Sequence, residues 1–222
     1  MIRPNLFYHY RNLRYGKRLW GSHQVKVASF LNDWNPKGDE LLLFGPSGGY
    51  SLPEAFIRKF SKIIAVEPDP VARMVFEKRF QVKPEWVKQP VQFNHRDDLA
   101  RFASFSGPVL FCNVLGQIPM KNTSSFRRVL HPFLEGRSFA SYHDAMSGND
   151  IEFDCEDAPR KKTGLTQMKS WIYVKNPSGK FEVTAHLAPD LFDEARGLEY
   201  RYWWWKITDR QSHLLEGVFK NV

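Results

Sequence analysis

The stretch Leu41-Leu42-Leu43-Phe44-Gly45-Pro46-Ser47-Gly48-Gly49-Tyr50 decides the fold of this chain. Its four leading apolar residues predict a buried strand, and the amphipathic segment 52–62 that follows predicts a helix. The glycine-rich turn between them lets a ligand approach the backbone, where a Cβ atom would block it. The order of strand, turn and helix therefore predicts a ligand-binding unit of an α/β domain.

An acid ends the next apolar segment, 63–67. Glu67 lies 22 residues after Gly45, and an acid at this place in an open α/β sheet accepts hydrogen bonds from the hydroxyls of a ribose. The two signals support each other. Together they predict a nucleoside site formed by the glycine-rich turn and Glu67.

Short apolar runs alternate with longer amphipathic stretches between residues 40 and 142, which is typical of strand–helix–strand units and a parallel sheet. The residues before the first strand read as largely helical. Helices are also predicted at 52–62, 70–80 and 124–134. The strands of this part are predicted at 41–44, 63–67, 91–95, 109–113 and 138–142.

The pattern changes beyond residue 144. The polar segment 144–169 predicts a loop or excursion, and a short helix is predicted near 190–196. The turn formers at 176–179 predict a hairpin, and a short polar connection near the end of the chain predicts an antiparallel edge pair. The strands of these two pairs are 171–175 with 181–187, and 198–207 with 213–219. In the edge pair, Trp203 and Trp205 share one face, opposite to Tyr202 and Trp204.

At residues 41–143 the chain resembles the class I S-adenosylmethionine-dependent methyltransferases. The resemblance implies a three-layer α/β sandwich with a seven-stranded, mostly parallel sheet, an antiparallel C-terminal hairpin and a helical N-terminal segment. It also implies S-adenosylmethionine as cofactor, with Glu67 on the ribose and either Asp97 or Asp98 near the adenine. The remaining cofactor-binding residues that it implies are Gly45, Ser47, Gly49 and Asn113.

Two positions depart from that family's pattern. Leu43 stands where an acid is usual, and Ser47 stands where the middle glycine is usual. A methyltransferase-like domain that binds a ligand without catalysis is therefore the alternative to an active enzyme. Gly45 to Gly49 also satisfies G-x-S-x-G, the nucleophile elbow of α/β-hydrolases, but the strands that precede such an elbow are missing. A nicotinamide site is disfavoured because Tyr50 occupies the third glycine position.

Methyl transfer from a sulfonium needs mainly alignment and exclusion of water, so the sequence names no dedicated nucleophile. Asn113 and His143 follow strands at the ligand-binding edge of the sheet and are the candidates for orienting or deprotonating a substrate. Cys112 reads as a core thiol. The seven histidines show no H-x-x-x-H cluster, so no metal site is predicted.

The 222 residues read as one domain: a basic N-terminal helical segment (1–38), a cofactor-binding core (39–143), and a substrate-side excursion with terminal strands (144–222). The first 38 residues hold seven Lys or Arg against one Asp, which is +6 of the net charge of +8. Aromatic residues interleave with these cations and favour RNA as acceptor, with a small molecule as the alternative. No apolar run is long enough to span a membrane and no leader is evident, so a cytoplasmic protein is expected.

Overall fold

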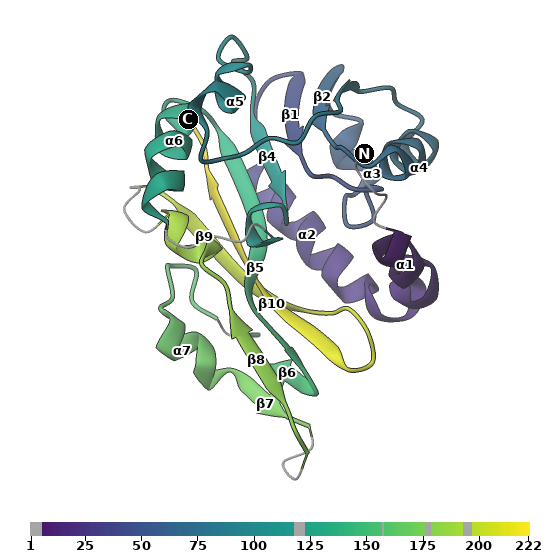
Figure 1. Cartoon of the computed structure of the whole chain (residues 1–222), viewed down its shortest axis with the longest axis vertical. Helices are drawn as coiled ribbons and strands as arrows, with labels where there is room; N and C mark the ends of the chain where they lie inside the picture. Colours follow the sequence, from purple (N-terminus) through teal and green to yellow (C-terminus); the bar gives the residue numbers. More distant parts are fainter. Residues whose placement is uncertain (1–5, 118–122, 157, 176–178, 193–196) are drawn as a thin grey trace.

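The computed structural model describes residues 6–117, 123–156, 158–175, 179–192 and 197–222, and its centre is a mixed β-sheet (Figure 1). The first five strands in spatial order run parallel, the sixth is antiparallel to them, and the seventh is antiparallel to the sixth. The order is β3 (Glu85–Val87), β2 (Lys62–Val66), β1 (Glu40–Phe44), β4 (Val109–Cys112), β5 (Phe139–Asn149), β10 (Gln211–Lys220) and β9 (Glu199–Lys206). An eighth strand, β8 (Glu182–Ala185), pairs with the far end of β5.

Helices cover both faces of this sheet and make three layers. One face carries α1 (Leu6–Leu19), α2 (Gly21–Trp34), α3 (Glu54–Ile57) and α4 (Pro70–Phe80). The other carries α5 (Arg96–Ala100), α6 (Ser124–Leu134), α7 (Leu165–Ser170) and the 3-10 turn η2 (Ala188–Phe192). The predicted three-layer α/β architecture is confirmed, including the antiparallel C-terminal hairpin. Among the described residues, no helix has the length and apolar character needed to cross a bilayer.

Burial on both faces explains the apolar run of β1. Leu41 and Leu43 pack under α2 and α3, whereas Leu42 and Phe44 pack on the side of α5 and α6. A central parallel strand must be apolar throughout because neither face meets water. Leu43, which replaces the usual acid of the family pattern, is fully buried.

The N-terminal helices are fastened to the end of the chain. The indole Nε1 of Trp20 donates a hydrogen bond to the carbonyl of Ile207 (3.1 Å). In α2, Nδ1 of His23 accepts one from Nε1 of Trp203 (3.1 Å). As predicted, Trp203 and Trp205 share this face of the sheet, whereas Tyr202 and Trp204 pack on the opposite face.

The third strand was predicted at the wrong place. The strand is Glu85–Val87, and residues 91–95 are irregular. Val91 and Phe93 alternate as in a strand, but they pack inward from the loop that follows β3, and Pro90 in that loop has no N–H for a sheet ladder. The predicted helix 52–62 is also shorter, a single turn at α3.

The region after residue 144 holds more structure than the sequence predicts. Strand β5 continues to Asn149, and β6 (Ile151–Phe153) pairs with β7 (Ile172–Val174) in a separate two-stranded sheet. Figure 1 shows β6, β7, β8 and α7 gathered around the far end of β5. The predicted hairpin between β7 and β8 is therefore wrong, because each strand pairs with a partner elsewhere in the chain. Of the short helix predicted at 190–196, η2 covers the start, and residues 193–196 lie outside the described part.

Candidate functional site

A cavity of about 250 Å³ opens at the C-terminal ends of β1, β2 and β4. Ligands bind at this edge of open α/β sheets because the loops there diverge. Its walls come from the glycine-rich turn, the end of β2, the loop after β3, the end of β4, and α1 with β9. Representative wall residues are Tyr8, Gly45, Glu67, Phe93, Asn113 and Trp205.

Glu67 is the best-organised group in this cavity. One carboxylate oxygen accepts a hydrogen bond from the backbone N–H of Ser47 (2.9 Å), and the other accepts one from the N–H of Asp69 (3.0 Å). Burial raises the pKa of Glu67, while these two N–H groups oppose the rise. The carboxylate is thus held rigidly across the turn, with lone pairs left over for a ligand's hydroxyl groups.

The glycine-rich turn has the left-handed backbone that its sequence suggests. Gly45 has φ +62°, and a Cβ there would come within 2.9 Å of Val114. Ser47 also has a positive φ, 51°, although it is not a glycine. Gly45 and Ser47 line the cavity. Gly49 instead packs against the Phe80 ring of α4, so it allows close helix packing and does not face the cavity.

Helix α1 covers the cavity and is anchored beside it. Tyr8 forms part of the wall, and burial, followed by the nearby Tyr50, raises the pKa of Tyr8. The next residue, His9, places Nδ1 2.6 Å from the Tyr50 hydroxyl and Nε2 3.3 Å from the Asp69 carboxylate. Asp69 also caps α4 by accepting from the N–H of Val71 (2.8 Å). Helix α1 is therefore fixed at the cavity rim and contributes Tyr8 to the wall.

The two aspartates predicted near an adenine lie outside the cavity wall. Asp97 is exposed on α5, and Asp98 accepts a hydrogen bond from the backbone N–H of Gln92 (2.8 Å). Asp98 thereby fixes the loop whose residues Val91 and Phe93 line the cavity. Asp98 thus contacts the loop beside the cavity and does not line the cavity itself, and the predicted contact with an adenine stays a prediction.

Asn113 joins the cavity to a buried acid–histidine pair. Its side-chain oxygen accepts from the N–H of Asp144 (3.0 Å), and its Nδ2 donates to the Asp144 carboxylate (3.3 Å). The same carboxylate oxygen lies 2.9 Å from Nδ1 of His213. Burial raises the pKa of Asp144, but His213, His186 and Asn113 together lower it by more. Asp144 is therefore a buried anion.

His143, the other predicted catalytic residue, lies on the opposite face of the sheet. It is fully buried, stacks on Phe192 and does not line the cavity. Its Nδ1 lies 2.9 Å from the Ser141 hydroxyl, and its Nε2 lies 3.4 Å from Glu216. Asn113 and His143 are thus not brought together.

Sequence reasoning missed most of the aromatic wall. Tyr8, Tyr50, Tyr142 and Trp205 surround one end of the cavity. The strand period did place Trp205 on a candidate aromatic face, but nothing local indicates that α1 folds back over it. Cys112 lines the cavity too, and burial raises the pKa of its thiol to about 12.

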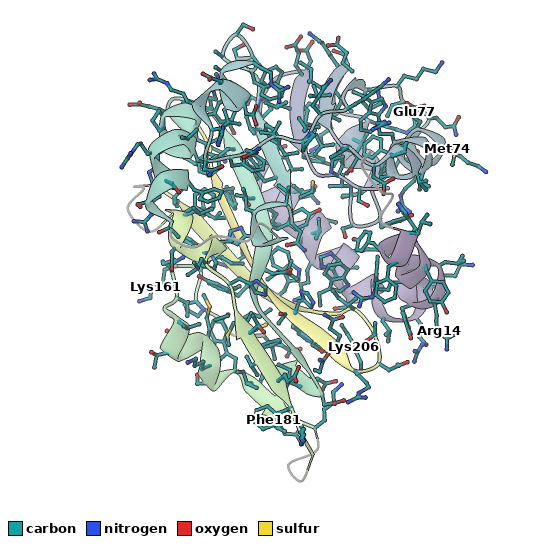
Figure 2. All side chains as sticks on the ribbon, viewed as in Figure 1. Arg14, Met74, Glu77, Lys161, Phe181 and Lys206 are labelled. Carbon is teal, nitrogen blue, oxygen red and sulfur yellow. The ribbon has the colours of Figure 1, made fainter. Side chains whose placement is uncertain are left out.

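The basic residues of the N-terminal segment lie outside the cavity. Arg14 and Lys17 are exposed on α1, and Figure 2 shows Arg14 at the outer edge of the molecule. Arg18 pairs with Asp209 (2.7 Å), and Arg11 stacks its guanidinium on Phe7. Within the described part of the chain, the charged side chains that line the cavity are Glu67 and Asp69, both acidic. No group of three or more His, Cys, Asp or Glu residues in that part is arranged to hold a metal ion.

No family model and no curated protein matches this chain. Several solved structures are similar to it in fold. A methyltransferase of Clostridium acetobutylicum described as S-adenosylmethionine-dependent superposes with a TM-score of 0.50 at 12% identity, over 98% of this chain and 99% of that one. One from Anabaena variabilis with the same description gives 0.50 at 13%, over 96% and 93%. The methyltransferase domain of bacterial CtHen1 gives 0.50 at 14%, over 91% and 100%. This chain therefore has the class I Rossmann-like methyltransferase fold.

Proposed function

We propose that this protein is an S-adenosylmethionine-dependent methyltransferase and that its cofactor occupies the cavity at the ends of β1, β2 and β4. One observation carries the proposal: the buried Glu67 carboxylate, fixed by the N–H groups of Ser47 and Asp69 beside the Gly45 turn. A vicinal diol supplies the two hydroxyl donors that this carboxylate has room to accept.

The remaining walls suit the other parts of such a cofactor. Val91 and Phe93 offer an apolar slot next to Glu67 for a purine ring. The turn at Gly45 and Ser47 is the wall that would take the amino-acid portion, and Asn113 also lines the cavity. When bound, the cofactor supplies a methyl group on a sulfonium that is already activated. The protein's contribution is then to align an acceptor and to exclude water, which α1 does by covering the cavity.

For the acceptor, the cavity favours a small molecule. Its charged wall residues are acidic, and the exposed cations Arg14 and Lys17 lie on the outer side of α1. An RNA acceptor, the first candidate from the sequence, would instead use those cations. Its binding would weaken with salt by a slope of about −0.7 per phosphate contacted, and Arg14→Ala with Lys17→Ala would reduce that slope.

Binding of S-adenosylhomocysteine, measured by titration calorimetry, tests the cofactor proposal. Glu67→Ala removes charge-assisted hydrogen bonds and is expected to weaken affinity by at least about tenfold. Glu54→Ala, at an exposed glutamate of α3, is the matched control and should bind as the wild type does. Equal affinities of the two variants would remove Glu67 from the ribose, and a wild-type protein without affinity would overturn the cofactor proposal.

Catalysis is tested separately, because Leu43 and Ser47 depart from the family pattern. An active enzyme converts S-adenosylmethionine to S-adenosylhomocysteine when offered pools of small metabolites or RNA. Tight cofactor binding without any turnover in either pool would favour the inactive binding domain.

A further inference from the structure

We infer that Asp144 and His213 form the proton-accepting pair of the acceptor site, and that this site takes a small molecule whose reacting group is an amine or a hydroxyl. The inference rests on the proposed function, because an acceptor site has meaning only beside a methyl donor. It assigns His213 as the group that touches the acceptor, and Asp144 as the positioning residue behind it.

The pair adjoins the cavity through two of its wall residues. Asn113 is hydrogen-bonded to Asp144 in both directions, so the carboxylate lies directly behind the wall at the end of β4. Trp205 lies opposite His213 in the β9–β10 ladder, and their ring centroids are 6.2 Å apart. His213 therefore stands next to the wall residue Trp205 and does not itself line the cavity.

Three buried ring nitrogens at this place make no hydrogen bond to the described residues: Nε1 of Trp205, which is a donor, and both Nδ1 and Nε2 of His213. The Asp144 carboxylate lies 2.9 Å from Nδ1 of His213 without making a hydrogen bond to it, and its negative charge favours the tautomer with the proton on Nδ1. In that tautomer Nε2 is an acceptor. A donor and an acceptor side by side match a group that can both accept and donate, as a hydroxyl or an amine does.

The charges around the pair argue against an anionic acceptor. Asp144 lies behind it, and Glu67 and Asp69 line the cavity. The other titratable side chains close by are His186, which interacts with Asp144 and His213, and His23 of α2, which stacks on Trp205. A carboxylate or phosphate would meet these acids with no lysine or arginine on the cavity wall in the described residues.

The proton step is simple to balance. The N–H or O–H bond of the acceptor breaks, its electron pair stays on the nitrogen or oxygen, and the proton binds the lone pair at Nε2 of His213. The proton on Nδ1 stays beside Asp144, whose negative charge stabilises the imidazolium that forms. The neutral or anionic nucleophile left behind is the species that a methyl donor requires.

Benzylamine, benzyl alcohol and benzoate test this assignment, because they present an amine, a hydroxyl and a carboxylate on the same ring. Their binding is measured by NMR on the full chain with and without S-adenosylhomocysteine, and the ¹⁵N shifts of the histidine rings are followed. We expect benzylamine or benzyl alcohol to bind in preference to benzoate and to shift Nε2 of His213, with Nδ1 little changed. Preferred binding of benzoate, or no binding of any probe, would overturn the inference.

Three variants separate this role from a structural one. His213→Gln and Asp144→Asn should each weaken binding of the preferred probe, His213→Gln by about tenfold because a buried donor loses its acceptor. His186→Gln is the matched control: this histidine also interacts with Asp144, but its Nε2 already faces the Ser147 hydroxyl (3.0 Å). Equal probe affinity in His213→Gln and His186→Gln would contradict the assignment.

Affinity for S-adenosylhomocysteine separates failure of this inference from failure of the proposed function. His213→Gln should keep the wild-type affinity, which also shows that the variant is folded. If the wild type binds the probes at His213 but has no affinity for S-adenosylhomocysteine, the methyltransferase proposal fails and the proton-accepting pair stands. If the wild type binds S-adenosylhomocysteine but the probes do not shift the His213 signals, the proton-accepting pair fails and the methyltransferase proposal stands.

Discussion

His143 and Asp144 are neighbours in β5, yet they belong to two different acid–histidine pairs on opposite faces of the sheet. His143 faces Glu216 of β10 at 3.4 Å, and Asp144 faces His213 of the same strand at 2.9 Å. The Glu216 pair is closed: Glu216 also accepts from the Tyr202 hydroxyl (2.6 Å) and lies 3.3 Å from Nζ of Lys162. The Asp144 pair adjoins the cavity wall through Asn113. Among the described residues, both pairs keep buried ring nitrogens without a hydrogen bond, Nε2 of His143 in one and both nitrogens of His213 in the other.

This difference separates a structural pair from a chemical one. Both pairs combine the same residue types, and both are buried, so neither composition nor burial distinguishes them. What distinguishes them is their surroundings: Tyr202 and Lys162 also contact Glu216, whereas Asp144 is hydrogen-bonded to Asn113 of the cavity wall. The closed pair ties the loop that carries Lys162 to the sheet, whereas the open pair, Asp144 with His213, lies next to the cavity wall.

The largest expected effect is on the closed pair. Glu216→Ala leaves Lys162 and Tyr202 without their shared carboxylate, so it is expected to lower the free energy of unfolding by about 3–5 kcal/mol. Denaturant unfolding measures this loss, with Glu135→Ala at an exposed site as control. A loss below that of the control would mean that the Glu216 pair has no structural role and would break the comparison.

A smaller effect is expected in acid, from His23 beneath the cavity wall. Burial lowers the pKa of His23 to about 3, and its ring stacks on Trp205 at 4.2 Å. Below about pH 6.5 the unfolded chain therefore binds a proton at His23 that the folded chain does not bind. The free energy of unfolding keeps its full His23 contribution above about pH 6.5 and loses it progressively as the pH drops toward 3. The expected loss between pH 7.5 and pH 5 is about 2 kcal/mol.

His23→Gln should remove that part of the acid sensitivity, since glutamine can keep hydrogen bonds to Trp203 and Ser51 without titrating. His95→Gln, at an exposed histidine, is the control. Thermal unfolding at both pH values measures the difference. If the wild type, His23→Gln and His95→Gln all lose the same stability in acid, the loss does not come from His23. The comparison would then show no difference in acid sensitivity between the two sides of the sheet.

The smallest expected effect concerns the helix that closes the open side. His9→Ala removes the contacts of α1 with Tyr50 and Asp69, which is expected to cost about 1 kcal/mol, or about fivefold in affinity for S-adenosylhomocysteine. Stopped-flow measurements should show faster dissociation of that ligand. His131→Ala, in α6 on the other face, is the control. An unchanged dissociation rate would mean that α1 does not restrict exchange of the ligand.

Patterns local in the chain predicted the fold well. Three elements can each be recognised within about ten residues, and all are confirmed: the run Leu41 to Phe44, the glycine-rich turn and the helix 70–80. The strand at 85–87 was missed because three residues are too few to show the alternation of apolar and polar side chains. Val91 and Phe93 show that alternation although they lie in a loop. The pairing of β7 and β8 was missed because it depends on partners far along the chain, which turn formers do not reveal.

The residues of the candidate site also divide into those that local sequence predicted and those that it did not. Gly45, Ser47, Glu67 and Asn113 follow from position in a known kind of sheet, and all line the cavity. His143 was chosen because it follows a strand, but a strand sends successive side chains to opposite faces, so a shift of one residue changes the face. Asp144 lies on the other side, and its partner His213 is 69 residues away in the sequence.

The bond from Trp20 to the carbonyl of Ile207 spans 187 positions of the chain, and this has a consequence for biosynthesis. The N-terminal helices are made before the rest of the sheet, and only part of their docking surface, β1 and α3, follows soon after them. Trp20 and the side of α2 that packs on β9 stay exposed until β9 has been made. Contacts of such long separation fold slowly and leave apolar surface open to association. The ligand site is therefore among the last parts of the molecule to be completed, and a nascent chain stalled before Trp205 would carry the glycine-rich turn without a finished site.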